Sequence, residues 1–203
     1  MVIMTRRIVL LVVLWCVSQA SVLAKNHEVM PKENPADSLD MVYTKGLLNF
    51  GTEAPDFVFT AENGEKCTLS SLRGRTKSGM RKPGKWVVLD FWATWCPDCR
   101  KEIPMMKTIY KRFSDKVEII GVSFDTDKNK FDNFVKSQGI EWLQYSEFVK
   151  WKDSKISKQY KIRWLPTIYL IAPDGKVAYT TVCAENLMKR LEALDKEEKL
   201  ATR

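Results

Sequence analysis

Histidine is nearly absent from this chain of 203 residues, because His27 is the only one. Close cysteine pairs are equally scarce, and Cys96 with Cys99 is the single example. Zinc sites usually take four Cys or His ligands, and this sequence offers neither a second close pair nor a nearby histidine. These absences argue against a zinc site, so we expect no metal and no other cofactor.

A hydrophobic run long enough to span a bilayer is also missing near the N-terminus. The apolar run Ile8–Val17 has about ten residues, half of the roughly 20 that a membrane-spanning helix needs. It follows Arg6 and Arg7 and precedes Val22-Leu23-Ala24, which suits cleavage by a signal peptidase. We therefore predict a signal peptide over residues 1–24 and export from the cytoplasm.

Two alternatives concern the same leader. An uncleaved leader extending to Leu23 would anchor the protein to the membrane. Lipidation at Cys16 is disfavoured, since a lipoprotein needs a small residue before the modified cysteine and Trp15 stands there.

Acidic residues are missing from the stretch between Arg73 and Lys85. It holds six basic residues, which are Arg73, Arg75, Lys77, Arg81, Lys82 and Lys85. Loss of the leader would reduce the formal charge from +8 to +6 (8 − 2, for Arg6 and Arg7). The stretch indicates an exposed basic loop, either a solvated one or one that steers an acidic partner. With no recognisable binding motif, nucleic acid is not an expected partner.

The remaining chain reads as one domain. Residues 25–50 are polar and broken by prolines, which predicts a tether. Residues 51–198 form the domain and 199–203 a C-terminal tail. Asn63-Gly64 between two short β-prone runs predicts a β-hairpin over residues 57–69.

Strand and helix patterns then alternate along the domain. We predict strands at 86–92, 117–123, 167–171 and 176–181. We predict one helix that starts near residue 97 and three more over 128–138, 151–160 and 185–196, with a further short segment near Trp142. The alternation predicts an α/β three-layer sandwich with a mixed central sheet.

The pair in Trp95-Cys96-Pro97-Asp98-Cys99 can cycle between dithiol and disulfide. A cysteine at a helix N-terminus is stabilised as thiolate by free backbone N–H groups and the helix dipole, so Cys96 is the candidate nucleophile. Cys99, one turn later, can resolve a mixed disulfide formed at Cys96. An inert structural disulfide is the alternative reading.

The chain resembles thioredoxin-fold proteins, and more narrowly the TlpA/ResA-like thiol–disulfide oxidoreductases. The resemblance rests on three motifs, which are Asp90-Phe-Trp-Ala-Thr-Trp-Cys-Pro-Asp-Cys99, Arg100-Lys-Glu-Ile-Pro104 and Trp164-Leu-Pro-Thr167. It covers roughly residues 51–194 and includes the early hairpin, which looks like the N-terminal extension of this branch.

The resemblance implies further site residues. Pro166 is expected in a cis peptide bond facing the disulfide, with the backbone of Leu165 pairing with substrate; an ordinary trans proline opening a strand is the alternative. Trp95 and Pro97, which flank Cys96, complete the expected substrate-contacting surface.

Two carboxyl groups are candidate bases for Cys99. Asp90 lies in an apolar strand, where burial should raise its pKa, and thioredoxins use a similar aspartate to deprotonate the resolving cysteine. Much of the TlpA-like branch has another residue there. Glu102 matches a glutamate of ResA-like proteins and is an alternative base or a substrate contact; a solvated carboxylate is its other reading.

The implied activity is reduction of disulfides in exported proteins, apocytochromes among them, with a membrane-linked thiol donor restoring the dithiol. Asp98 should disfavour the Cys96 thiolate, which favours a reductant over an oxidase or isomerase. A peroxidase would need Pro and Thr where this chain has Leu89 and Ala93. The non-enzyme alternative, a metal-binding thioredoxin fold, would resemble proteins with CxxxC and a downstream histidine.

Cys67 and Cys183 lie in or beside predicted strands. We expect buried, unreactive thiols, with a structural disulfide between them as the alternative.

Overall fold

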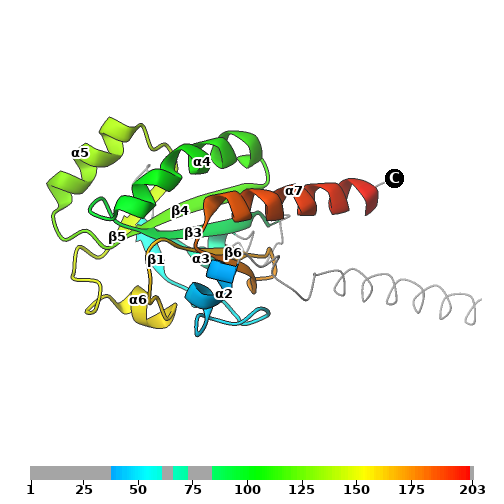
Figure 1. Cartoon of the computed structure of the whole chain (residues 1–203), viewed down its shortest axis with the longest axis horizontal. Coiled ribbons are helices and arrows are strands. Elements are labelled where there is room, and N and C mark those ends of the chain that lie inside the picture. The colour runs from blue at the N-terminus through cyan, green and yellow to red at the C-terminus, as the bar shows by residue number, and fades with distance from the viewer. Residues whose placement is uncertain (1–37, 61–65, 73–83, 202–203) are drawn as a thin grey trace, which may run out of the picture. The chain divides into compact units, whose positions relative to one another are not determined.

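The computed structural model describes residues 38–60, 66–72 and 84–201, which belong to one compact unit, Pro35–Arg203 (Figure 1). The predicted signal peptide, the Asn63-Gly64 turn and most of the basic loop between Arg73 and Lys85 lie outside the described residues. Within the described ranges, no helix is both long enough and apolar enough to cross a bilayer.

A mixed five-stranded sheet forms the centre of this unit, in the order β5-β4-β3-β6-β7. The strands are β3 (Trp86–Trp92), β4 (Val117–Ser123), β5 (Leu143–Ser146), β6 (Thr167–Ile171) and β7 (Val177–Thr181). The first three are parallel to one another, β6 pairs antiparallel with β3, and β7 pairs antiparallel with β6. This arrangement confirms the predicted thioredoxin-like α/β fold.

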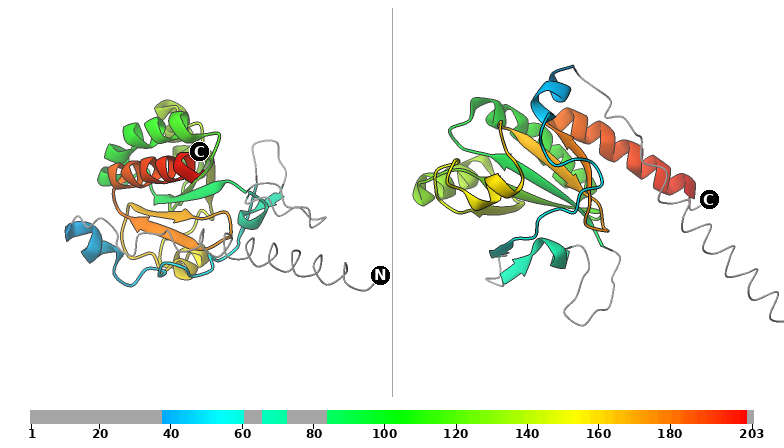
Figure 2. Two further views of the ribbon diagram at one scale, coloured as in Figure 1. Left: turned by 90° about the vertical axis from the view of Figure 1, so that its right-hand side faces the viewer. Right: turned by 90° about the horizontal axis from the view of Figure 1, so that it is seen from below.

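Helices cover both faces of the sheet (Figures 1 and 2). On one face lie α4 (Pro97–Phe113), α5 (Lys128–Gln138) and α7 (Ala184–Ala201), and on the other lies α6 (Lys155–Gln159). Successive side chains of β3 point to opposite faces of the sheet, so each face can be covered by helices. Trp92 packs against Phe131 of α5 on one face, and Phe91 packs against Tyr160, beside α6, on the other.

The predicted hairpin is present as β1 (Val58–Thr60) and β2 (Lys66–Thr68), followed by the short helix α3 (Leu69–Leu72). Phe59 on β1 is buried, and Phe57 contacts Tyr145 of β5 with ring centroids 5.2 Å apart. The Tyr160 hydroxyl also donates a 2.6 Å hydrogen bond to the carbonyl of Pro55. These contacts attach the hairpin segment to the face of the sheet that carries α6.

The expected tether does not hold for residues 38–50. They form α2 (Ser38–Thr44) and a turn from which Leu47 and Leu48 enter the core. Asp40 explains the difference, because its buried carboxylate accepts hydrogen bonds from β7 and the residues after it. Those long-range partners cannot be identified from the local polar composition of the segment.

Two helices differ in length from the prediction. The Ser154 side chain accepts a hydrogen bond from the backbone N–H of Ser157, so α6 begins at Lys155 rather than near Trp151. α7 extends to Ala201, into the predicted tail. Lys116, after α4, pairs with Asp195 at 2.7 Å and with Glu198 at 2.8 Å, which supports these last turns.

Candidate functional site

The strand register places three loops at the same end of the sheet, namely those that follow β3 and β4 and the one that precedes β6. Phe91 of β3 pairs with Thr167 of β6, so the loop after β3 and the loop before β6 emerge side by side. Trp92 also pairs with Ser123, the last residue of β4. The register therefore brings together Cys96, Pro166 and the residues that follow β4.

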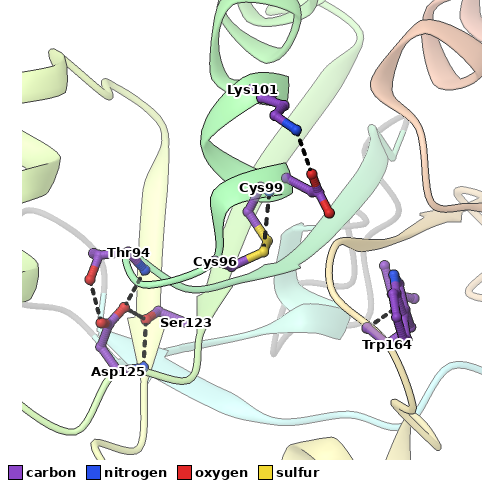
Figure 3. The surroundings of a disulfide bond; sticks show 9 residues. Thr94, Cys96, Cys99, Lys101, Ser123, Asp125 and Trp164 are labelled. Carbon is purple, nitrogen blue, oxygen red and sulfur yellow. Dashed lines mark hydrogen bonds and ion pairs between the residues drawn. A yellow bond between two sulfur atoms is a disulfide. The ribbon is translucent and has the colours of Figure 1, made fainter.

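Cys96 and Cys99 form a disulfide with Cα atoms 5.3 Å apart (Figure 3). Cys96 is the N-cap of α4, and its Sγ accepts a hydrogen bond from the backbone N–H of Cys99 at 3.1 Å. Pro97 occupies the first helical turn, where the absence of its N–H costs no helical bond. In the reduced protein the same N–H and the helix dipole would stabilise a Cys96 thiolate.

Burial does not distinguish the two cysteines. Cys96 is 5 % exposed and Cys99 is 4 % exposed. Pro97 is exposed, and Trp95 is 54 % exposed, so the surface around the disulfide is accessible. The assignment of Cys96 as nucleophile therefore rests on its helix-capping position.

Asp98 is paired, which changes its expected influence on the thiolate. Its carboxylate lies 2.8 Å from the ammonium of Lys101 one turn later, and both side chains are well exposed. A nearby cation and water screen much of the negative charge. Asp98 is thus a weaker argument for a reductant than the sequence suggested.

A buried carboxylate that the sequence analysis did not single out anchors the loop before Cys96. Asp125 accepts hydrogen bonds from the backbone N–H of Thr94 at 2.9 Å and from its hydroxyl at 2.6 Å (Figure 3). The Ser123 hydroxyl donates a third, also at 2.6 Å. The sequence did contain one indication of this role, because Asp125 follows a predicted parallel strand directly. Ligands and catalytic groups usually lie at the carboxyl ends of such strands.

Asp90 and Glu102 lie on the α4 side of the sheet. Burial, with a smaller contribution from the charge of Glu102, raises the pKa of Asp90 to about 7, which confirms the expected direction. Burial likewise raises the pKa of Glu102, although a hydrogen bond from the Ala184 N–H opposes this. Because Glu102 follows Cys99 by three residues on α4, the two side chains are neighbours on the helix surface.

Glu102 is therefore more than a solvated carboxylate. It accepts the N–H of Ala184, the first residue of α7, at 2.6 Å and is half-buried. The interaction joins the start of α7 to the turn of α4 that follows the disulfide. Sequence reasoning could not find this contact, since 82 residues separate the partners.

The peptide bond between Leu165 and Pro166 is cis, as expected. Both residues are buried, whereas the preceding Trp164 is 44 % exposed. Tyr43 of α2 packs on Trp164 with ring centroids 4.7 Å apart. α2 thus forms part of the border of the cis-proline loop, a role that its expected status as tether did not suggest.

Cys67 and Cys183 are free, half-buried thiols. The alternative of a disulfide between them is not present in the structure. In the part of the chain that is described, no group of three or more His, Cys, Asp and Glu side chains could hold a metal ion.

Comparison with known proteins agrees with this geometry. The profile of the AhpC/TSA family matches residues 50–180. The chain is 38% identical over 134 residues to the thiol-disulfide oxidoreductase ResA of Bacillus subtilis (strain 168), an alignment that covers 66% of this chain and 67% of that protein. With ResA of Bacillus cereus (strain ZK / E33L) the identity is 36% over 149 residues, covering 73% and 78%.

Solved structures give the same result. The thioredoxin domain of a thiol-disulfide oxidoreductase from Bacteroides vulgatus superposes with a TM-score of 0.61 at 27% identity, covering 72% of this chain and 98% of that one. A putative thiol:disulfide interchange protein DsbE from Chlorobium tepidum gives 0.60 at 25% identity, covering 72% and 97%. The disulfide, the cis-proline loop and these likenesses point to a single chemistry, thiol–disulfide exchange.

Proposed function

Because the chain belongs to the AhpC/TSA family and is a thiol–disulfide oxidoreductase, we propose that it reduces disulfides in exported proteins. The observation that carries this proposal is the Cys96–Cys99 disulfide at the N-terminus of α4, beside a cis-proline loop. Such a pair can accept and release two electrons without any cofactor.

The exchange begins with the Cys96 thiolate, which attacks one sulfur of the substrate disulfide. A mixed disulfide forms, and the other substrate sulfur leaves as a thiolate and takes up a proton. Leu165, whose backbone precedes the cis bond, pairs with the extended substrate segment and positions its sulfur over Cys96. Trp95 and Pro97, exposed beside Cys96, contact the same segment.

Cys99 then attacks the Cys96 sulfur and releases the second substrate thiol. This step requires Cys99 to lose its proton, and Asp90 is the proposed acceptor, because a carboxyl with a pKa of about 7 can exchange protons near neutral pH. Glu102, its neighbour, supports the raised pKa and is the alternative acceptor. The enzyme ends as the disulfide, and the substrate has gained two electrons and two protons.

The carboxyl groups near Cys99 favour the reducing direction. A disulfide becomes more oxidising when the protein stabilises the thiolate of the reduced form. Glu102 acts in the opposite sense, since its negative charge disfavours a neighbouring thiolate, and Asp90 does so in the fraction of molecules in which it is ionised. Their burial makes this effect stronger than that of the exposed Asp98.

The leader over residues 1–24 supports a location outside the cytoplasm. Disulfides persist there, so substrates are available, but glutathione and thioredoxin are not. The enzyme therefore needs a membrane-linked thiol donor to regenerate its dithiol. Extracytoplasmic protein isolated after export should begin at Lys25; an N-terminus at Met1 would instead indicate the membrane-anchored form.

Equilibration with a redox buffer tests the direction of the reaction. We expect a reduction potential below about −230 mV, and a value near −120 mV would make the protein an oxidase. In parallel, the reduced protein should reduce insulin, and Cys96→Ser should abolish this activity. Cys99→Ser should instead accumulate mixed disulfides through Cys96, which identifies the substrates. Failure of the reduced wild-type protein to reduce insulin or any trapped substrate would overturn the proposal.

A further inference from the structure

An open pocket lies next to the cis-proline loop and is strongly basic. It encloses about 620 Å³ and is lined by four cations, Lys152, Lys158, Lys161 and Arg163, together with Trp151 and Ile162. The four cationic side chains belong to exposed residues. Within residues 38–60, 66–72 and 84–201, none of the four forms an ion pair with a carboxylate.

Of the two acidic residues closest in sequence, Glu147 and Asp153, neither forms an ion pair with the four cations within the described ranges. Glu147 accepts hydrogen bonds from the Ser154 hydroxyl at 2.6 Å and the Lys155 N–H at 2.9 Å, so its carboxylate is used at the start of α6. Asp153 is exposed and meets Lys158 through its backbone carbonyl. The pocket therefore presents a concentrated positive charge.

The backbone at Lys161 is a second observation. Its φ of 54° lies in the left-handed region, where glycine or asparagine usually ends a helix. A lysine at this position costs backbone energy that a glycine would avoid. Lys161 also lines the pocket, so the position combines an unfavourable backbone with a cationic residue at the pocket wall.

The pocket is also close in sequence to the cis-proline loop. Arg163 lies in its wall and precedes Leu165 by two residues, whereas an extended substrate segment advances about 3.3 Å per residue. A substrate segment that pairs with the backbone at Leu165 would reach the pocket roughly two to five residues from its reactive cysteine.

We propose that this pocket binds acidic residues of the substrate protein and so selects substrates whose disulfide is flanked by Asp or Glu. The inference rests on the proposed reductase function, because the substrate segment must lie along the cis-proline loop. An extended acidic peptide fits better than a flat anionic membrane, since the pocket is concave and its wall includes Arg163, two residues before Leu165. Trp151 and Ile162 supply apolar contact for the aliphatic parts of the same segment.

Matched peptides test the proposal. Each carries one disulfide to a small thiol, with either three Glu or three Gln placed two to five residues before or after the cysteine. The reduced full-length protein should reduce one acidic peptide about fivefold faster than its Gln counterpart, measured as kcat/KM at low ionic strength. The advantage should largely vanish at about 0.5 M salt.

Charge reversals identify the responsible residues. Lys158→Glu with Lys161→Glu should abolish the acidic preference and leave reduction of the Gln peptides unchanged, which also shows that the variant is folded. The control, Lys111→Glu with Lys136→Glu, changes the net charge equally in the last turns of α4 and α5, remote from the sheet edge. It should retain the preference.

The outcomes separate this inference from the proposed function. Equal reduction of acidic and Gln peptides by the wild-type protein would overturn the proposed role of the pocket and leave the proposed reductase function unaffected. Lysine-dependent binding of the acidic peptide with Ser for Cys, without reduction of any peptide, would support the pocket and contradict the reductase. Lysine-dependent binding to vesicles of anionic lipid, with no acidic preference among peptides, would reassign the pocket to the membrane and overturn the inference.

Discussion

Glu102 of α4 accepts a 2.6 Å hydrogen bond from the backbone N–H of Ala184, the first residue of α7. One carboxylate thereby joins the helix that carries the disulfide to the helix beside it. The same charge contributes to the raised pKa of Asp90. Glu102 thus has a structural effect and an electrostatic effect, and substitutions can separate them.

Glu102→Gln should keep an acceptor for the Ala184 N–H but remove the negative charge. The pKa of Asp90 should fall, so the pH dependence of mixed-disulfide release should move to lower pH. Glu102→Ala should produce the same shift and also lower the free energy of unfolding by about 1 kcal/mol, because the N–H loses its partner. Equal stability losses in both variants would contradict this separation.

Asp90 should make the stability of the oxidised protein depend on pH. Its folded pKa of about 7 lies above the value of about 3.9 in an unfolded chain. The folded state therefore binds more protons between about pH 4 and pH 7, and stability falls as pH rises through this window. Asp90→Asn should be more stable than wild type at pH 8 by about 2 to 4 kcal/mol and similar at pH 4, as measured by urea unfolding.

Catalysis gives a second readout for Asp90. If it accepts the Cys99 proton, Asp90→Asn should slow release of the mixed disulfide and remove the inflection near pH 7, while the initial attack by Cys96 keeps its rate. The exposed Asp98→Asn is the matched control. An unchanged release profile in Asp90→Asn would transfer the role of base to Glu102.

Asp125 should be required for the position of the loop before Cys96. Asp125→Ala leaves the Thr94 N–H, the Thr94 hydroxyl and the Ser123 hydroxyl without their acceptor, and we expect a loss of about 2 to 3 kcal/mol in unfolding free energy. The rate of substrate attack should also fall. Asp125→Asn keeps one acceptor oxygen and should recover part of the unfolding free energy and part of the rate of substrate attack. A fully active and fully stable Asp125→Ala variant would refute the anchoring role.

Asp40 should hold α2 in place. Its buried carboxylate accepts the Thr181 hydroxyl at 2.6 Å, the Val182 N–H at 2.8 Å and the Asn186 amide at 3.0 Å. Asp40→Ala should cost about 2 to 3 kcal/mol and expose the bond after Lys45 to trypsin. The substitution should also change Trp164 fluorescence through loss of the Tyr43 contact. Lys66→Ala, at the exposed first position of β2, is a neutral control.

The sequence predicted the elements that depend on local pattern. The strands at 86–92, 117–123 and 167–171 have the expected bounds, because each is a short apolar run with clear breaks. The Cys96 helix cap and the raised pKa of Asp90 also follow from neighbouring residues. Such features need no knowledge of the tertiary contacts.

Features that depend on distant partners were missed. Residues 38–50 were predicted as part of a tether because the stretch 25–50 is polar and broken by prolines, yet Asp40 and Thr181 interact across 141 positions. Asp125 looked like an ordinary residue after a strand until the sheet register placed it beside Thr94. The pairing of Asp98 with Lys101 was within reach, since a spacing of three residues on a helix favours it.

The packing of Tyr43 on Trp164 has a practical consequence for enzymology on shortened proteins. A polypeptide trimmed to the family boundary at residue 50 would retain both cysteines and the cis-proline loop while deleting α2. Its turnover of a small disulfide reagent would look intact, but protein substrates would contact a cis-proline loop whose border has changed. Selectivity measured on such fragments would describe the truncation and not the native enzyme.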